Sequence, residues 1–167
     1  MRRTIVIVLA ALVALLGAAP PAQAGTGWVP FPSPPFDLAA GVVCGFGVHG
    51  EPTVDEVRVK TIEEYPDGSP KRQLAVGALK IRLTNTDTGA STIADAGGSA
   101  VFEFFLDGTR KWHVIGPVLA AFREGGANIP RGLWTLNGVY DIFFSATNVK
   151  TVTFYRGGVH DLCADLD

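Results

Sequence analysis

The chain has 167 residues, with 14 lysines and arginines against 16 aspartates and glutamates, for a formal charge of −2. A chain of this length can bury one sizeable core and lies within the size range of a single domain. It has no excess of positive charge, so neither nucleic acid nor an anionic lipid surface is expected as a partner.

Residues 1–24 have the pattern of a cleavable signal peptide. Arg2 and Arg3 form a basic start, an apolar run follows at residues 5–16, and a small-x-small cleavage site ends at Ala24. The apolar run is shorter than the roughly 20 residues that span a bilayer. We therefore expect a secreted mature protein with no membrane insertion after cleavage. Removing two of the 14 basic residues changes the formal charge from −2 to −4.

Residues 25–40 are rich in glycine and proline and are predicted to form an extended leader to one all-β domain at residues 41–167. Closely spaced prolines exclude a helix or a central strand in the leader. Its aromatic side chains, Trp28, Phe31 and Phe36, are candidates for docking on the domain or on a partner. A flexible terminus is the default for such a segment.

Beyond the leader, short runs rich in Val, Ile, Thr and aromatic residues alternate with turn signals, which predicts a succession of short strands. One segment, residues 118–123, is ambiguous. Its apolar spacing fits one face of a helix, but it is too short for a stable helix, so a strand is favoured. The other expected strands are residues 42–48, 54–63, 74–83, 91–95, 100–106, 111–115, 133–136, 139–146, 151–155 and 158–163.

The spacing of these strands favours a single antiparallel β-sandwich or a small closed β-barrel. Tight turns with positive φ are expected at Asp67-Gly68, Thr88-Gly89, Asp107-Gly108 and Asn137-Gly138. Aromatic residues carry the largest apolar areas and are therefore candidates for the core. These candidates are Trp112, Trp134, Phe102, Phe104, Phe143 and Phe154.

The two cysteines, Cys44 and Cys163, are most simply explained as one disulfide in an exported chain. This bond would join the start and the end of the domain. In the chain-entropy model, a loop of this length adds at most about 4–5 kcal/mol to stability. A free catalytic cysteine is accordingly not expected.

Two of the three histidines, His49 and His160, are candidates for a metal site. If the two cysteines face each other on neighbouring antiparallel strands, these histidines become diagonal neighbours on one face. With Glu51 or Asp161 they would form a ligand set that zinc accepts. Surface histidines without a metal are the alternative that the sequence favours, and no cofactor is expected.

Other motifs favour structural roles. Gly45, Gly47 and Gly50 spell G-x-G-x-x-G, but Pro52 and a strand-like run follow where a dinucleotide site needs a helix. Glycines that permit tight sheet packing explain the pattern better. No serine lies in G-x-S-x-G or S-x-x-K, so no nucleophile is indicated.

The segment Asn85-x-Asp87-x-Gly89 resembles part of a calcium loop but lacks the later glutamate, so a hairpin turn is predicted. The adjacent acids Glu63 and Glu64 would point to opposite faces of a strand, which argues against a catalytic carboxylate pair.

Three short motifs make the chain similar to a known type of protein. They are C-G-F-G-V at residues 44–48, T-N-T-D-T-G at residues 84–89 and D-L-C-A-D-L at residues 161–166. Over residues 44–166 the chain resembles a family of small exported bacterial all-β proteins with a C-G-F-x-V start, a T-N-x-x-T-G turn and a terminal D-x-C-A-x-L. Gly47 replaces the proline expected there. The resemblance implies export, β structure and the disulfide, and it transfers no catalytic residue.

The sequence favours a non-catalytic binding or surface-interaction module. The alternatives are a secreted hydrolase or metal-dependent enzyme, and a structural component of the cell envelope. A deep pocket with a histidine among carboxylates would indicate an enzyme, and an open apolar cleft a small apolar ligand. A flat aromatic patch would indicate a protein or polysaccharide partner.

Overall fold

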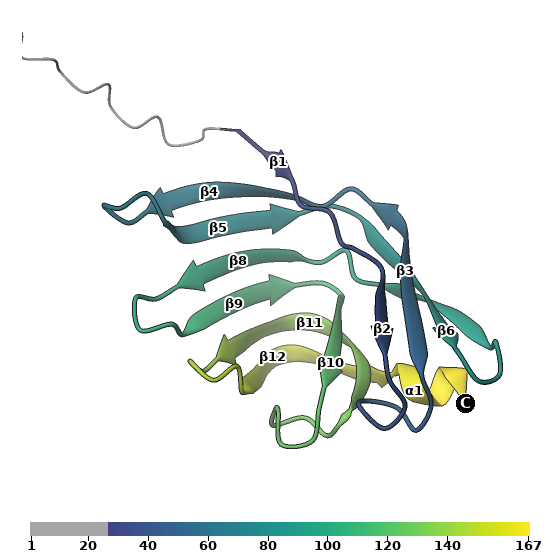
Figure 1. The fold of residues 1–167 in the computed structure, drawn as a ribbon. Helices are drawn as coiled ribbons and strands as arrows, with labels where there is room; N and C mark the ends of the chain where they lie inside the picture. The colour runs from purple at the N-terminus through teal and green to yellow at the C-terminus, as the bar shows by residue number, and fades with distance from the viewer. Residues whose placement is uncertain (1–26) are drawn as a thin grey trace, which may run out of the picture.

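A computed structural model describes residues 27–167 of the chain. They form antiparallel strands followed by one short helix (Figure 1), so the all-β prediction is confirmed. The signal peptide expected at residues 1–24 lies outside the described residues. In chain order the elements are β1 (Val29–Pro30), β2 (Phe36–Leu38), β3 (Val48–Asp55), β4 (Arg58–Glu64), β5 (Pro70–Val76), β6 (Leu79–Asn85), β7 (Ser91–Asp95), β8 (Ser99–Phe104), β9 (Arg110–Ile115), β10 (Val118–Phe122), β11 (Gly132–Phe144), β12 (Lys150–Asp161) and α1 (Leu162–Leu166).

The strands form two antiparallel sheets that do not close into a barrel, so the barrel alternative is wrong. The four-stranded sheet has the order β2-β3-β6-β7. The eight-stranded sheet runs β1-β4-β5-β8-β9-β11, and β10 and β12 also pair with β11. β10 pairs with residues 132–136 of β11 and β9 with residues 139–144, while β12 pairs along the opposite edge.

Several strands that follow one another in the chain are separated only by a short bend, and these bends lie side by side in a line. Only two or three residues separate β3 from β4, β5 from β6, β7 from β8 and β9 from β10. β11 and β12 pass through without a break. Backbone hydrogen bonds join neighbouring bends, as from Gly98 N to Pro117 O at 2.7 Å and from Gly116 N to Gly138 O at 2.8 Å. We name this line the crease; it consists of residues 56–57, 77–78, 96–98, 116–117, 137–138 and 157–158 (Figure 1).

Glycine is required at the crease because the backbones approach too closely for a side chain. Gly138 and Gly157 face each other on β11 and β12, with φ of 127° and 113°. A β-carbon on Gly138 would overlap the carbonyl oxygen of Arg156, and one on Gly157 would overlap that of Asn137. Such bends let a strand turn from one packing layer into another.

Two hydrophobic cores lie on opposite sides of the N-terminal half of β11. The first is shared by the four-stranded sheet, β11 and α1, and its fully buried residues include Leu83, Leu133 and Leu166. The second includes Phe122 of β10 and Tyr140 of β11. Because its members come from both sides of the crease, the second core fills the inside of the bend in these strands.

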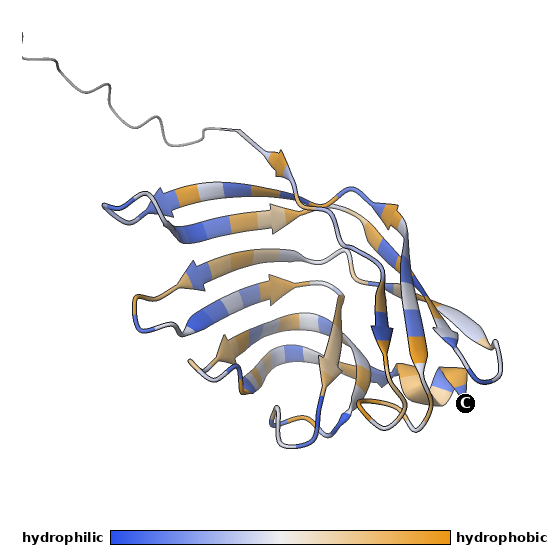
Figure 2. Cartoon of the chain, viewed as in Figure 1, coloured by the Kyte–Doolittle hydropathy of each residue, from blue (hydrophilic) through white to orange (hydrophobic). Residues whose placement is uncertain are grey.

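The side of the eight-stranded sheet that faces the second core is its inner face. Val114 of β9 and Tyr140 of β11 are cross-strand partners on this face. Their neighbours His113 and Asp141, also partners, point the opposite way, because side chains alternate along a strand. We name that side the outer face. Polar and apolar residues alternate along several of these strands in Figure 2.

The C-terminal helix is attached to the first core by two contacts. The expected disulfide between Cys44 and Cys163 is present, with Cα atoms 5.5 Å apart. The buried Asn85 donates from Nδ2 to the carbonyl oxygen of Leu166 at 2.9 Å, and its Oδ1 accepts from the backbone N–H of Asp87 at 2.9 Å. The segment around Asn85 is thus the hairpin turn that its sequence predicts.

Several expected strand boundaries are wrong. The Asn137-Gly138 turn does not form, because β11 bends at Gly138 without reversing direction. The expected strand at residues 74–83 is interrupted at Gly77 for the same reason. Residues 42–47 form turns and bends beside the disulfide, so β3 begins only at residue 48.

The end of the chain also differs from expectation. The strands expected at residues 151–155 and 158–163 are one strand, β12, which passes through the crease. Cys163 lies in α1 instead of a strand, because the side chain of Asp161 caps the helix by accepting from the N–H groups of Cys163 and Ala164.

Two predicted strands and three predicted turns are confirmed. β7 spans residues 91–95, and residues 118–122 form the strand β10. The other three expected turns have positive φ at Gly68, Gly89 and Gly108.

Most of the aromatic residues expected in the core lie on the inner face. Trp112, Trp134 and Phe154 pack against the second core, and Phe102 contacts Trp112 with ring centroids 4.7 Å apart. Phe143 is 39% exposed because it lies on the outer face, so its assignment to the core is wrong. Phe104 is partly buried.

The leader is extended and supplies two short strands. β1 pairs with β4, and β2 pairs with β3. Phe36 packs directly over Gly50, where a β-carbon would overlap its ring, so this leader aromatic docks on the domain. Phe31 is 55% exposed.

Replacing Gly157 with alanine tests the crease. We expect the free energy of unfolding to fall by about 2–5 kcal/mol, because the new β-carbon meets backbone atoms at a positive φ. Chemical denaturation followed by near-ultraviolet circular dichroism measures the loss. Gly158→Ala is the matched control, since a β-carbon there meets nothing within 4 Å. Equal effects of the two substitutions would contradict the constraint.

Candidate functional site

The structure does not bring the two candidate metal-binding histidines onto one sheet face. His49 lies on β3 of the four-stranded sheet and His160 on β12 of the eight-stranded sheet, so the expected diagonal pairing is wrong. Each ring instead contacts a nearby carboxylate at 2.8 Å, His49 that of Asp37 and His160 that of Asp165. Within residues 27–167, no group of three or more His, Cys, Asp and Glu side chains is placed to hold a metal ion.

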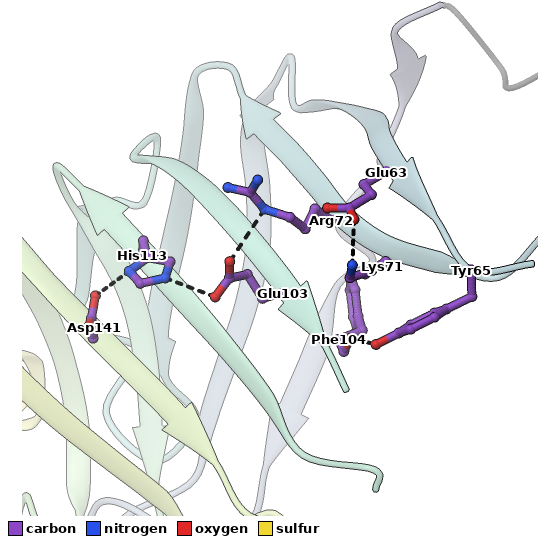
Figure 3. A network of polar contacts seen from close by, with 8 residues as sticks. All are labelled: Glu63, Tyr65, Lys71, Arg72, Glu103, Phe104, His113 and Asp141. Carbon is purple, nitrogen blue, oxygen red and sulfur yellow. Dashed lines mark hydrogen bonds and ion pairs between the residues drawn. The ribbon is translucent and has the colours of Figure 1, made fainter. Parts of the chain in front are cut away.

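The third histidine, His113, lies between two carboxylates on the outer face (Figure 3). Its Nδ1 is 2.7 Å from Oδ1 of Asp141, and its Nε2 is 3.1 Å from Oε2 of Glu103. Register places these side chains on the neighbouring strands β8, β9 and β11. A neutral imidazole carries one N–H, so only the imidazolium can donate to both carboxylates at once.

Asp141 is the centre of this network. Its side chain is only 8% exposed, and its Oδ2 lies 2.7 Å from both Lys111 Nζ and Tyr155 Oη. At the far end of the network, Nε of Arg72 approaches Oε1 of Glu103 at 3.3 Å, without the alignment of a hydrogen bond. The network thus joins side chains from β5, β8, β9, β11 and β12.

The contacts around Asp141 stabilise its charge. Burial raises the pKa of the Asp141 carboxyl, but hydrogen bonds from Lys111, Tyr155 and His113 outweigh burial and hold the pKa below its usual value. The hydrogen bond to Asp141 also raises the pKa of Lys111 and that of Tyr155. All three pKa shifts favour the state in which Asp141 is a charged carboxylate and Lys111 and Tyr155 keep their protons. The folded protein therefore stabilises the charge on Asp141.

An apolar hollow of about 370 Å³ lies beside the network on the outer face. Its aliphatic side chains come from β5, β8, β9 and β11, at the positions between the inner-face residues of these strands. His113 borders it. Ile115 is 65% exposed in the hollow, and Trp28, which precedes β1, lines it from the leader. The outer-face residues that line the hollow with Trp28 are Leu74, Val76, Ser99, Val101, His113, Ile115 and Val139. Residues between them along the strands, whose side chains point to the inner face, also border it: Ala75, Ala100, Val114 and Tyr140.

A second cleft, of about 450 Å³, lies where β7, β12 and α1 meet. It contains His160 and Asp165, whose side chains contact each other at 2.8 Å, together with the exposed Ile93. Its lining is mixed polar and apolar, and its histidine and carboxylate already contact each other. The hollow on the outer face therefore offers the more distinctive binding surface.

Sequence reasoning missed both His113 and the hollow. Val101 and Glu103 alternate on one predicted strand, and His113 and Asp141 lie on two others, but nothing in these segments shows that the side chains meet. Which strands neighbour one another, and in what register, is not readable from their sequences. The G-x-G-x-x-G motif was correctly expected to serve packing, since Gly50 lies beneath an aromatic ring.

Comparison of the chain with protein-family models, with curated proteins and with solved structures finds no match in any of the three. The resemblance to a family of small exported β proteins therefore stays a prediction from its motifs.

Replacing Asp141 with asparagine should lower the free energy of unfolding by about 2–4 kcal/mol at pH 7, because Lys111 loses a buried counter-charge and the hydrogen bonds of Tyr155 and His113 to the carboxylate are weakened. The folded protein holds the pKa of Asp141 below its unfolded value, so this stabilisation is complete above the unfolded pKa of about 4. It is lost as the pH falls through the folded value. Urea unfolding should show the two proteins converging between about pH 5 and pH 2.

The matched control is Asp37→Asn. Asp37 also contacts a histidine at 2.8 Å, but its side chain is 80% exposed, so we expect a much smaller loss of stability. A loss at Asp37 as large as that at Asp141, or a constant difference across the pH range, would contradict the central role of Asp141.

Proposed function

We propose that the chain is an exported, non-catalytic binding module with sandwich-like packing of its sheets, and that it holds a small apolar ligand in the hollow on the outer face. The observation that carries this proposal is the hollow itself. Aliphatic side chains from four neighbouring strands gather there with Trp28, and several of them remain exposed. Open concave apolar surfaces of this size suit a small ligand.

The apolar surface provides a driving force for binding. Ile115 is 65% exposed and Val139 39% exposed, and they are cross-strand partners in the hollow. Covering such surface contributes about 25 cal/mol for each Å² removed from water. The strands beneath are fixed by pairing on both sides, so little ordering is needed when a ligand binds.

The geometry of His113 supports a non-catalytic role. A general base needs a ring nitrogen that is free to accept a proton from a substrate. Both nitrogens of His113 already lie within 3.1 Å of a carboxylate oxygen, and the Asp141 carboxylate is committed to Lys111 and Tyr155. These contacts stabilise a charged network and leave no group poised to act on a ligand.

Two features support export, a signal-peptide pattern and a disulfide. Residues 1–24 have the composition of a signal peptide, and the disulfide between Cys44 and Cys163 suits an oxidising compartment outside the cytosol. In the part of the chain that the structure describes, no helix has the length and apolar character needed to cross a membrane.

A neutral apolar dye, N-phenyl-1-naphthylamine, tests the proposed function. We expect saturable binding with energy transfer from Trp28, which lines the hollow. Ile115→Asp should weaken binding at least about tenfold, because a charge then has to be buried against the dye.

The control variant is Leu106→Asp at the turn between β8 and β9, where an 80% exposed leucine lies outside the hollow. It should bind the dye as the unmodified protein does. Binding that is absent, or that is equally strong in the Ile115 variant, would overturn the proposed function.

A further inference from the structure

Charged side chains flank the hollow at the end formed by β4 and β5. Lys60 of β4 is the cross-strand partner of Leu74, which lines the hollow. Because cross-strand partners share a face, Lys60 stands on the outer face beside the apolar surface. Arg72 lies two residues from Leu74 on β5 and therefore on the same face.

The carboxylates near this end already have partners. Glu103 contacts both Arg72 and His113, and Asp141 contacts Lys111 and His113. Farther along β4, Glu63 is paired with Lys71. No carboxylate of this group remains unpaired to neutralise another cation.

Lys60, in contrast, has no ion-pair partner within residues 27–167. It is half-buried, and a lysine in such a position can cover apolar surface with its aliphatic stem while its ammonium group stays available. Arg72 meets Glu103 only through a poorly aligned Nε. The β4–β5 end of the hollow is therefore positively charged, although the chain as a whole is acidic.

We propose that the ligand of the hollow is an amphiphile with a single anionic head group, of the long-chain carboxylate class. Its apolar body lies on Leu74, Val101 and Ile115, and its head group pairs with Lys60 and Arg72. This inference rests on the proposed function and adds the charge and the orientation of the ligand. It follows from an apolar surface with half-buried positive charge at its β4–β5 end, whereas the cation at the other end, Arg156, is exposed and more strongly screened by water.

Three probes with the same twelve-carbon chain separate the two proposals: dodecanoate, dodecanol and dodecyltrimethylammonium. Each is titrated below its micelle-forming concentration into the disulfide-bonded protein, with binding followed by calorimetry and tryptophan fluorescence. We expect dodecanoate to bind on the order of tenfold more tightly than the other two at low salt. Added salt should reduce this advantage, since it screens partly exposed charges.

The variant Lys60→Gln should reduce the advantage of dodecanoate to less than about threefold and leave dodecanol binding unchanged. Arg156→Gln is the matched control. Arg156 is also exposed and is the cross-strand partner of Val139, but it lies at the opposite end of the hollow, on β12. It should keep the full preference for dodecanoate.

The outcomes are distinguishable. If none of the three probes binds, the proposed function fails together with this inference. If all three bind equally, or the ammonium probe binds best, apolar binding stands and the anionic head group is refuted. A loss of preference in the Arg156 variant with none in the Lys60 variant would refute the assigned orientation.

Discussion

The close approach of backbones at the crease is the constraint on which the other features of this fold depend. Neighbouring bends are joined by backbone hydrogen bonds, and Gly138 and Gly157 bring two strands together where no β-carbon fits. The bends therefore cannot slide past one another. Because side chains alternate with a period of two, a fixed bend determines which residues of each strand reach the outer face.

The crease also explains why the apolar hollow lies where it does. Val76 and Ile115 are the last outer-face residues before their bends, and Val139 is the first after the bend in β11; each is next to a glycine in the sequence. Glycines have no side chains that could lean over these residues and fill the space. Farther from the crease the same face carries the network around Asp141, which binds the strands laterally through charge-assisted hydrogen bonds.

The sequence is sufficient to predict the all-β class, the disulfide and three tight turns, because these depend on composition and on local glycine chemistry. It is misleading at Asn137-Gly138, where the same dipeptide that starts many hairpins instead bends a continuous strand. A positive φ is needed in both cases, so local sequence does not distinguish a hairpin from a bend.

The site around His113 depends on which strands are neighbours, and no local sequence pattern encodes the neighbours of a strand. The pairing of His49 with His160 depends on an assumed register of neighbouring strands, and the topology places the two residues on different sheets.

The attachment of the C-terminal helix has a consequence for how the chain acquires its structure. The first core combines Val43 and Val48, near the start of the domain, with Leu162 and Leu166 at its end. That core cannot be completed until the last residues are available, whatever has already formed in the middle of the chain. Contacts so distant in sequence are expected to make folding slow, and the covalent link between the ends can close only afterwards. For the export that we propose, this delay would keep the chain unfolded until its final segment has crossed the membrane.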